Sequence, residues 1–245
     1  MPGSRLLSAQ LSAVEQHESA VPDKAAVHEM RVAIRRLRAA LRVLGLKELD
    51  PQVKRLQDAL GKVRDLQLQV DWLRGRDAAL CNARVASLRG AEQELGRELS
   101  RWRSDALPAL LRAAGDSAAS THKVWKILRK RLAMLEDRLE RARRSLSPQA
   151  LHRARISVKQ VRYLLDAAKK SLPKKTLSLE SDLKTLQATL GELHDLDVRI
   201  ELLKRKPALL RDQRELRKRL GKIASAQLDR WRDQHLVERA GNALR

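Results

Sequence analysis

Both halves of the chain carry the same three sequence segments in the same order, and this internal repeat constrains the fold more than any other feature. The matched pairs are VHEMRVAIRRLRAAL from Val27 with LHRARISVKQVRYLL from Leu151, QDALGKVRDLQ from Gln57 with QATLGELHDLD from Gln187, and LSRWRSDAL from Leu99 with LDRWRDQHL from Leu228. The offset between partners changes by only a few residues, as duplication followed by small loop changes produces. The sequence therefore predicts one structural unit built twice.

The repeated unit is predicted to be helical. Apolar residues make up 43% of the chain and charged residues 33%, whereas aromatic residues reach only 2% and Phe is absent. Apolar positions recur at steps of three and four, as at Leu37, Leu41 and Leu44, which is the spacing of a helix with one buried face. Few glycines and prolines leave little turn chemistry for β-hairpins. We expect an all-α protein of about eight long helices.

Proline-containing breaks divide the helical chain. They fall at Pro22-Asp23, Asp50-Pro51, Ser147-Pro148, Leu172-Pro173 and Lys206-Pro207. Asp or Ser can cap a helix there, and Pro fits its first turn. The small-residue stretch AAGDSAAST, residues 113–121, is the best candidate boundary between the repeats. We therefore expect a first helical bundle over residues 1–118 and a second over residues 119–245.

The high positive charge of the chain indicates an anionic binding partner. Lys and Arg total 52 against 30 Asp and Glu, a formal net charge of +22. A surface this basic is typical of proteins that bind nucleic acid, a phosphate polymer or an anionic membrane. Cys81 is the single cysteine, so no intramolecular disulfide or thiolate metal cluster can form. With no signal-peptide core or membrane span evident in the sequence, we expect a cytoplasmic protein without membrane insertion.

Positive side chains line one face of the first matched helix. At 100° per residue they fall in a stripe about 80° wide, made of His28, Arg31, Arg35, Arg38 and Arg42. The second half repeats the spacing with His152, Arg155, Lys159 and Arg162 and ends in Asp166. A solvated charged face is the alternative interpretation. However, like charges three and four residues apart repel by a few tenths of a kcal/mol per pair, about 0.2–0.5. The uninterrupted rows favour a counter-anion that spans several cations.

The second matched segment adds further candidates. Lys54 and Lys184 occupy equivalent positions and could extend the rows. Gly61 and Gly191 interrupt helices at a cost of about 1 kcal/mol relative to Ala, which allows another helix or a ligand to approach, unless they are tolerated weak spots. Asp65, like its counterpart in the second half, is expected to pair with arginines and orient them.

The histidines that begin the rows suggest a proton linkage. Surrounding cations disfavour the charged imidazole, and a bound anion restores it. His28 and His152 are therefore hypothesised to take up protons on binding. A histidine that packs between helices with a satisfied hydrogen bond is the alternative for either residue.

These motifs resemble the CHAD family, the conserved histidine α-helical domains. HEMRVAIRRLRAAL and HRARISVKQVRYLL are similar to that family's paired histidine-containing helices, and QDALGKVRDLQ and QATLGELHDLD to its second helices. The resemblance implies a single CHAD domain of two pseudo-symmetric four-helix bundles with a basic channel between them. It also implies binding of inorganic polyphosphate in that channel and, as in some members, association with polyphosphate granules.

The resemblance nominates the polyphosphate-binding residues. They are His28, Arg31, Arg35, Arg38, Lys54, His152, Arg155, Lys159, Arg162 and Lys184, with Arg5 and Arg129 on the preceding helices. The helical stripe adds Arg42 to this set of expected polyphosphate-binding residues. The chain departs from a symmetric pattern where Asp166 stands opposite Arg42 and Thr185 opposite Arg55. The first half is therefore expected to be the more basic.

Nucleic acid is the strongest rival ligand because its backbone satisfies the same cations. Single-strand binders stack bases on aromatic side chains, yet Trp102 and Trp231 lie on helical patterns that favour core anchoring. Duplex binding through backbone contacts remains the alternative. No phosphate-binding glycine loop, nucleophile elbow or histidine pair at metal-ligand spacing occurs in the sequence. We therefore expect no enzymatic activity, no catalytic or metal-binding residue and no cofactor.

Overall fold

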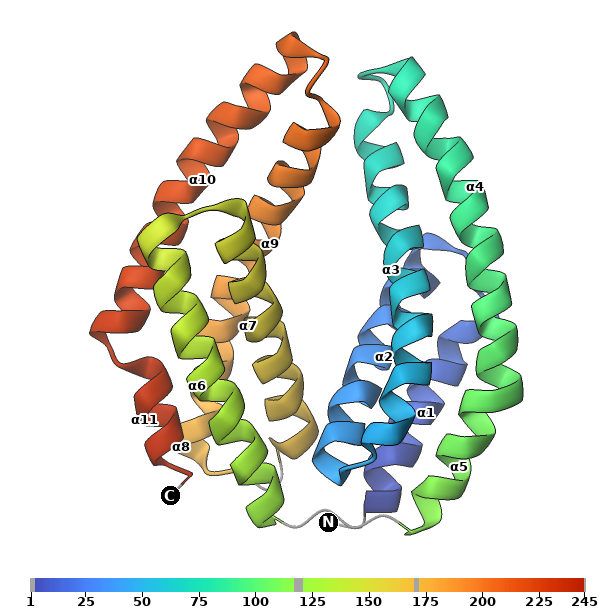
Figure 1. Ribbon diagram of the computed structural model, residues 1–245, viewed down its shortest axis with the longest axis vertical. Coiled ribbons are helices and arrows are strands. Elements are labelled where there is room, and N and C mark those ends of the chain that lie inside the picture. Colours follow the sequence, from blue (N-terminus) through green and yellow to red (C-terminus); the bar gives the residue numbers. More distant parts are fainter. Residues whose placement is uncertain (1–2, 117–120, 170–171, 245) are drawn as a thin grey trace. The chain divides into compact units, whose positions relative to one another are not determined.

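The computed structural model describes residues 3–116, 121–169 and 172–244 of the 245. All regular secondary structure in these ranges is helical (Figure 1), which confirms the all-α prediction. The chain forms two compact units, Met1–Ser120 and Thr121–Arg245. The boundary expected after residue 118 lies within residues 117–120, outside the described residues.

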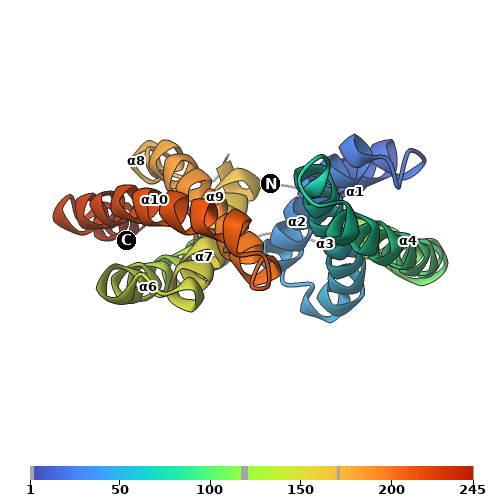
Figure 2. The same ribbon diagram turned by 90° about the horizontal axis from the view of Figure 1, so that it is seen from above.

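In the first unit, each long helix packs on its neighbour in sequence. Helix α1 packs against α2, α2 against α3 and α3 against α4, while α5 returns to α1 (Figures 1 and 2). A π-helical turn, η2, joins α4 to α5 without a break. The bounds are α1 Gly3–Glu18, α2 Lys24–Leu44, the 3-10 turn η1 Lys47–Leu49, α3 Asp50–Leu73, α4 Ala78–Arg101, η2 Trp102–Ala106 and α5 Leu107–Asp116.

In the second unit, α6 packs against α7, α7 against α9 and α9 against α10, and α10 also contacts α6. Short helix α11 packs against α6 and α8. The bounds are α6 Thr121–Ser145, α7 Pro148–Ala168, α8 Lys174–Leu177, α9 Leu179–Leu202, α10 Pro207–Asp233 and α11 Leu236–Asn242.

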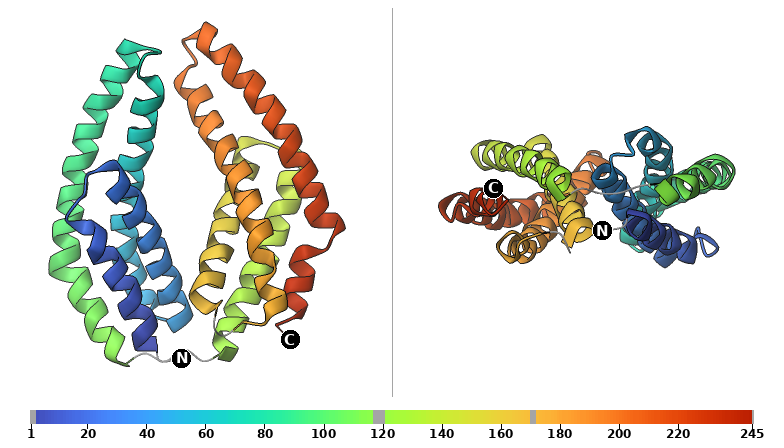
Figure 3. Two further views of the ribbon diagram at one scale, coloured as in Figure 1. Left: turned by 180° about the vertical axis from the view of Figure 1, so that it is seen from behind. Right: turned by 90° about the horizontal axis from the view of Figure 1, so that it is seen from below.

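The repeat extends to helix length. Helices α2 and α7 both contain 21 residues, and α3 and α9 both contain 24. The eight helices of at least 16 residues among the described residues are α1 to α4, α6, α7, α9 and α10, which agrees with the expected number. The end where α3 leads into α4 extends beyond α1 and α2. In the same way, the end where α9 leads into α10 extends beyond α6 and α7 (Figures 1 and 3).

The five predicted breaks are helix starts in the structure. Ser147 caps α7 by accepting a hydrogen bond from the Ala150 amide at 3.3 Å. Asp23 occupies the cap position of α2, but its side chain makes no capping hydrogen bond. Helices α3, α8 and α10 begin at the remaining three breaks. Gly45, with a φ of 84°, ends α2 in the left-handed conformation that favours glycine.

The apolar faces predicted for the matched helices are buried. On α2, Met30, Ile34 and Leu37 are fully enclosed, as are the equivalent aliphatic side chains of α7. Trp102 and Trp231 are 2% and 6% exposed, so both tryptophans anchor the core as predicted. Because this burial fixes the rotation of α2 and α7, it also fixes where their cationic faces lie.

Candidate functional site

The first row, defined as His28, Arg31, Arg35, Arg38 and Arg42 of α2, runs from solvent into the protein. The His28 side chain is 54% exposed, whereas those of Arg31 and Arg38 are 16% and 11% exposed. Arg35 is partly buried between them. The row therefore offers its amino-terminal end to solvent, while its carboxyl-terminal end faces protein.

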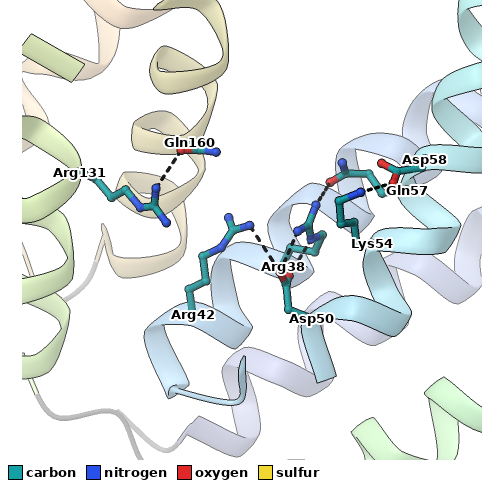
Figure 4. A network of polar contacts seen from close by, with 8 residues as sticks. All are labelled: Arg38, Arg42, Asp50, Lys54, Gln57, Asp58, Arg131 and Gln160. Carbon is teal, nitrogen blue, oxygen red and sulfur yellow. Dashed lines mark hydrogen bonds and ion pairs between the residues drawn. The ribbon is translucent and has the colours of Figure 1, made fainter. Parts of the chain in front are cut away.

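Arg38 is held at two edges of its guanidinium group (Figure 4). Nε and Nη2 donate to the two carboxylate oxygens of Asp50 at 2.7 and 2.8 Å. Nη1 donates to Gln57 Oε1 at 3.1 Å. Arg42 adds an ion pair with Asp50 at 3.8 Å. Asp50, the first residue of α3, thus ties the end of the first row to the neighbouring helix.

The network changes the ionisation of Asp50. Burial alone would raise the pKa of this carboxyl group, but hydrogen bonds from Arg38 and the positive charges of Arg38, Arg42 and Lys54 lower it below its usual range. The carboxylate is therefore ionised at neutral pH and neutralises part of the first row.

The second row, defined as His152, Arg155, Lys159 and Arg162 of α7, repeats one of these contacts. Arg162 Nη1 donates to Gln187 Oε1 at 2.7 Å. Arg162 matches Arg38, and Gln187 matches Gln57, in the internal repeat. The duplicated sequence thus preserves an arginine whose angle is set by a glutamine on the next helix.

The matched arginines differ in their remaining contacts. Arg162 Nε is shielded from solvent but has no hydrogen-bond partner among the described residues, whereas Arg38 Nε binds Asp50. When Gln57 is aligned with Gln187, the residue that corresponds to Asp50 is Glu180. A shielded donor without an acceptor is unfavourable by about 1–3 kcal/mol, so the Arg162 guanidinium is suited to accept an anion.

The predicted role of Asp65 is confirmed by its contact with Arg31, whose Nη1 lies 3.5 Å from Asp65 Oδ1. The glycines one turn away leave different amounts of room. A Cβ atom at Gly61 would lie 3.9 Å from Arg31 Nη2, and one at Gly191 would meet nothing within 4 Å among the described residues. No described helix therefore approaches Gly191 closely.

Two imidazoles meet at the start of the second row. Nδ1 of His152 and Nδ1 of His194, on α9, lie 3.4 Å apart, and the ring centroids are separated by 4.9 Å. This is a contact between histidines of neighbouring helices, so His152 matches the interpretation of a packing histidine while remaining part of the row. His28, at the matched position, lies near Glu29, with 3.9 Å between Nε2 and Oε1.

Both imidazoles are neutral at neutral pH. Burial, and then the positive charges of Arg155 and Lys159, lower the pKa of His152. The same causes, with burial the largest, lower the pKa of His194 to about 4. The pair therefore adds no positive charge to the second row until an anion or acid favours protonation.

The remaining nominated residues lie toward solvent. Lys54 is 57% exposed and forms an ion pair with Asp58 one turn along α3, although its charge still contributes to the low pKa of Asp50. Lys184 and Arg129 are also exposed, and Arg155 and Lys159 are partly exposed. The side chain of Arg5 lies outside the described residues.

Arg64 and His194 were missed by the prediction of site residues. They occupy matched positions in the second repeated segment, on the same helical face as Gln57 and Gln187. Arg64 Nη1 is shielded and lacks a hydrogen-bond partner among the described residues. The pairing of two ionisable residues in the aligned segments was the signal that could have found them.

Two arginines of α6 were not predicted because no periodic pattern marks them. Arg131 donates to Gln160 Oε1 at 3.2 Å (Figure 4), and Arg138 donates to Ser157 Oγ at 2.8 Å. On α7, Ser157 and Gln160 lie on a different face from the second row. These arginines therefore join α6 to α7 and are not members of the row.

Within residues 3–116, 121–169 and 172–244, no cluster of three or more His, Cys, Asp or Glu side chains could hold a metal ion. Over the same residues, none of the helices combines the length and apolar character that crossing a bilayer requires.

Comparisons with known proteins place the chain in a family. The structure is similar to the crystal structure of the CHAD domain from the plant Ricinus communis, with a TM-score of 0.65 and 23% sequence identity, covering 93% of this chain and 90% of that chain. Among curated protein sequences, none matches significantly. The model of the CHAD domain family matches residues 5–204, and the chain therefore belongs to the CHAD domain family.

Proposed function

We propose that the chain binds inorganic polyphosphate through the cationic rows of α2 and α7. The observation that carries the proposal is the guanidinium of Arg162, whose Nη1 donates to Gln187 while its shielded Nε has no partner among the described residues. Gln187 orients Arg162 without neutralising its charge, whereas in the first unit Asp50 neutralises the matched Arg38. Membership of the CHAD family supports the same ligand.

The chemistry of the rows suits a phosphate polymer. An arginine guanidinium is planar, stays charged and offers paired donors to phosphate oxygens. Arg64 Nη1 and Arg162 Nε are shielded donors without a described acceptor, and phosphate oxygens would satisfy them. Repeated cations along a helix match repeated charges along a polymer better than they match one isolated phosphate.

Binding without turnover is part of the proposal. The chain is proposed to hold polyphosphate and not to cleave it, and association with polyphosphate granules would follow from that affinity. Incubation of the chain with long-chain polyphosphate should release no orthophosphate above a protein-free control, with and without added Mg²⁺. Steady release proportional to protein concentration would contradict a binding role.

Competition at near-physiological salt tests the ligand. Labelled long-chain polyphosphate is bound to the chain and challenged with unlabelled polyphosphate, single-stranded DNA or double-stranded DNA at equal phosphate concentration. Polyphosphate should displace the label at concentrations at least tenfold lower than either DNA. Equal displacement would indicate general attraction to phosphate backbones and would make nucleic acid the better assignment.

Charge reversal tests the rows. Arg35→Glu in α2 and Lys159→Glu in α7 occupy matched positions in the repeat. Arg89→Glu, on an exposed position of α4, changes the net charge equally and serves as the control. The two row variants should each weaken binding by tenfold or more beyond the control. Equal losses in all three variants would indicate diffuse attraction.

A further inference from the structure

Helices α4 and α10 occupy matched places in the repeat and so provide an internal comparison. They begin at Ala78 and Pro207, and one constant offset aligns them without a gap through to Trp102 and Trp231. Both helices pack against the preceding long helix of their own unit. A residue that the shared hairpin requires should therefore be similar in both copies.

Helix α10 carries an apolar stripe that polar residues interrupt in α4. The α10 stripe is defined as Leu209, Leu216, Leu220 and Ile223, which share an arc about 60° wide at 100° per residue. Leu216 is 48% exposed and Ile223 is 52% exposed. Their matched positions in α4 are Ser87 and Glu94. Since the first unit builds the same hairpin with polar residues there, folding of the hairpin does not account for the stripe.

Ion pairs cover the corresponding edge of the first unit. Lys62 of α3 lies 2.6 Å from Glu94 of α4, and Arg55 lies 3.7 Å from Glu98. In the second unit the matched pairs are Glu192 with Ile223 and Thr185 with Gln227. A polar connection between the two helices has thus been replaced by an exposed apolar surface. Exposed leucine and isoleucine at seven-residue spacing indicate a helix-packing surface.

The charges beside the α10 stripe are separated by sign along the helix. Asp212 and Glu215 come before Leu216 in the sequence and lie on the solvent side of the stripe. Arg219 and Lys222 come after Leu216 and lie on the same side. When a second α10 is laid antiparallel with Leu216 opposite Leu216, Leu209 falls opposite Ile223. Asp212 then lies within one residue of the position opposite Arg219. A parallel pair would instead place each acid beside an acid and each base beside a base.

We propose that two copies of the chain associate through an antiparallel pairing of their α10 stripes. Four side chains per copy bury much less than the roughly 800 Å² per partner of a standard interface, so the dimer is weak. The net charge of +22 opposes self-association. Added monovalent salt screens this repulsion and leaves apolar contacts intact, so dimerisation strengthens as salt rises. Association bridged by a polyanion would weaken instead.

Sedimentation equilibrium over a concentration series tests the dimer without polyphosphate. The variant Leu216→Ser with Ile223→Glu places in α10 the residues that α4 already carries at those positions, so the helix should still fold. The wild-type chain should show a monomer–dimer equilibrium that this variant abolishes. Leu111→Ser, which changes a 53% exposed leucine of α5, should dimerise like wild type. A wild-type chain that stays monomeric at millimolar concentration would overturn the proposal.

Cysteine cross-linking tests the antiparallel register. In a Cys81→Ser background, Leu216→Cys places two thiols across the dimer axis and should form a disulfide-linked dimer rapidly. Ile223→Cys alone should cross-link at least tenfold more slowly, and combination with Leu209→Cys should restore the rate. Equal cross-linking by Leu216→Cys and Ile223→Cys alone would indicate a parallel or non-specific contact and would overturn the register.

Discussion

Arg38 and Asp50 form a two-point ion pair in which both carboxylate oxygens accept hydrogen bonds from one guanidinium edge, at 2.7 and 2.8 Å. The pair links the last turns of α2 to the first residue of α3. Arg162, the matched arginine of the second unit, keeps the glutamine contact but leaves its Nε without a described partner. The same repeated residue is therefore expected to stabilise one unit and to bind ligand in the other.

Substitution Asp50→Asn should destabilise the fold. It removes the charge that two arginines face and leaves the buried Arg38 partly uncompensated, so the free energy of unfolding should fall by about 1–3 kcal/mol. Urea titration followed by far-ultraviolet circular dichroism measures the change. Asp58→Asn, which removes an exposed acid beside Lys54, should lie within about 0.5 kcal/mol of wild type. Equal effects would contradict a structural role for Asp50.

Replacement of the matched arginines by lysine should separate stability from binding. Arg38→Lys loses the two-point pair with Asp50 and should lower the urea midpoint with little effect on polyphosphate affinity. Arg162→Lys should leave the midpoint nearly unchanged and weaken binding about fivefold or more, the equivalent of about 1 kcal/mol. Titration calorimetry with polyphosphate of defined length provides the affinities. The proposed division of roles fails if Arg38→Lys has the larger binding defect.

Polyphosphate affinity should rise as pH falls from about 7 to about 5. The pKa values of His152 and His194 are lowered in the free protein, for His194 to about 4. A bound anion favours the charged imidazoles and raises those pKa values, so binding takes up protons and is stronger in mild acid. A histidine with an unperturbed pKa would give the rise in affinity over a higher pH range.

The variant His194→Arg provides the matched control because Arg64 stands at that position in the first unit. A permanent charge should tighten binding at pH 7 and flatten the pH dependence between pH 7 and pH 5. Proton uptake, measured as the dependence of the binding enthalpy on buffer ionisation, should fall in the same variant. An unchanged pH profile would assign the linkage to other groups.

The histidine pair should also make folding stability depend on pH. Their folded-state pKa values lie below the unfolded value of 6.5, so the unfolded chain binds more protons as the pH drops. Stability from the neutral pair is complete above about pH 6.5 and is lost as pH falls toward 4. Urea midpoints of wild type should decline from pH 7 to pH 4.5, and His194→Gln should decline less. This range ends above the acid titration of Asp50.

Much of the fold could be predicted from the sequence because the spacing of apolar residues in each helix shows which of its faces is buried. Aliphatic spacing on α2 and α7 predicted which side is enclosed, and the proline-containing breaks predicted where α2, α3 and α7 begin. The same spacing placed the cationic rows on the other face. These properties depend on residues within one helix, where 100° per residue relates sequence position directly to direction.

Contacts between helices did not follow in the same way. The capture of Arg38 by Asp50 and the meeting of His152 with His194 depend on the axial shift of one helix along its neighbour. Lys54, predicted to extend the row, also pairs with Asp58 at the exposed surface, a contact that the predicted row did not include. Helical periodicity gives the direction in which a side chain points, but it does not give the axial position of the side chain's partner on the neighbouring helix.

The sequence by itself determined the helical class, the duplicated unit and the two rows of cations, because local spacing and internal alignment contain that information. Only the tertiary structure decided which cations are already neutralised. Arg38 lies against a carboxylate of α3, whereas Arg162 meets a glutamine of α9 and keeps an unfilled donor. The physical reason is that an ion pair requires atoms to lie within a few ångströms, and packing between helices alone sets that distance.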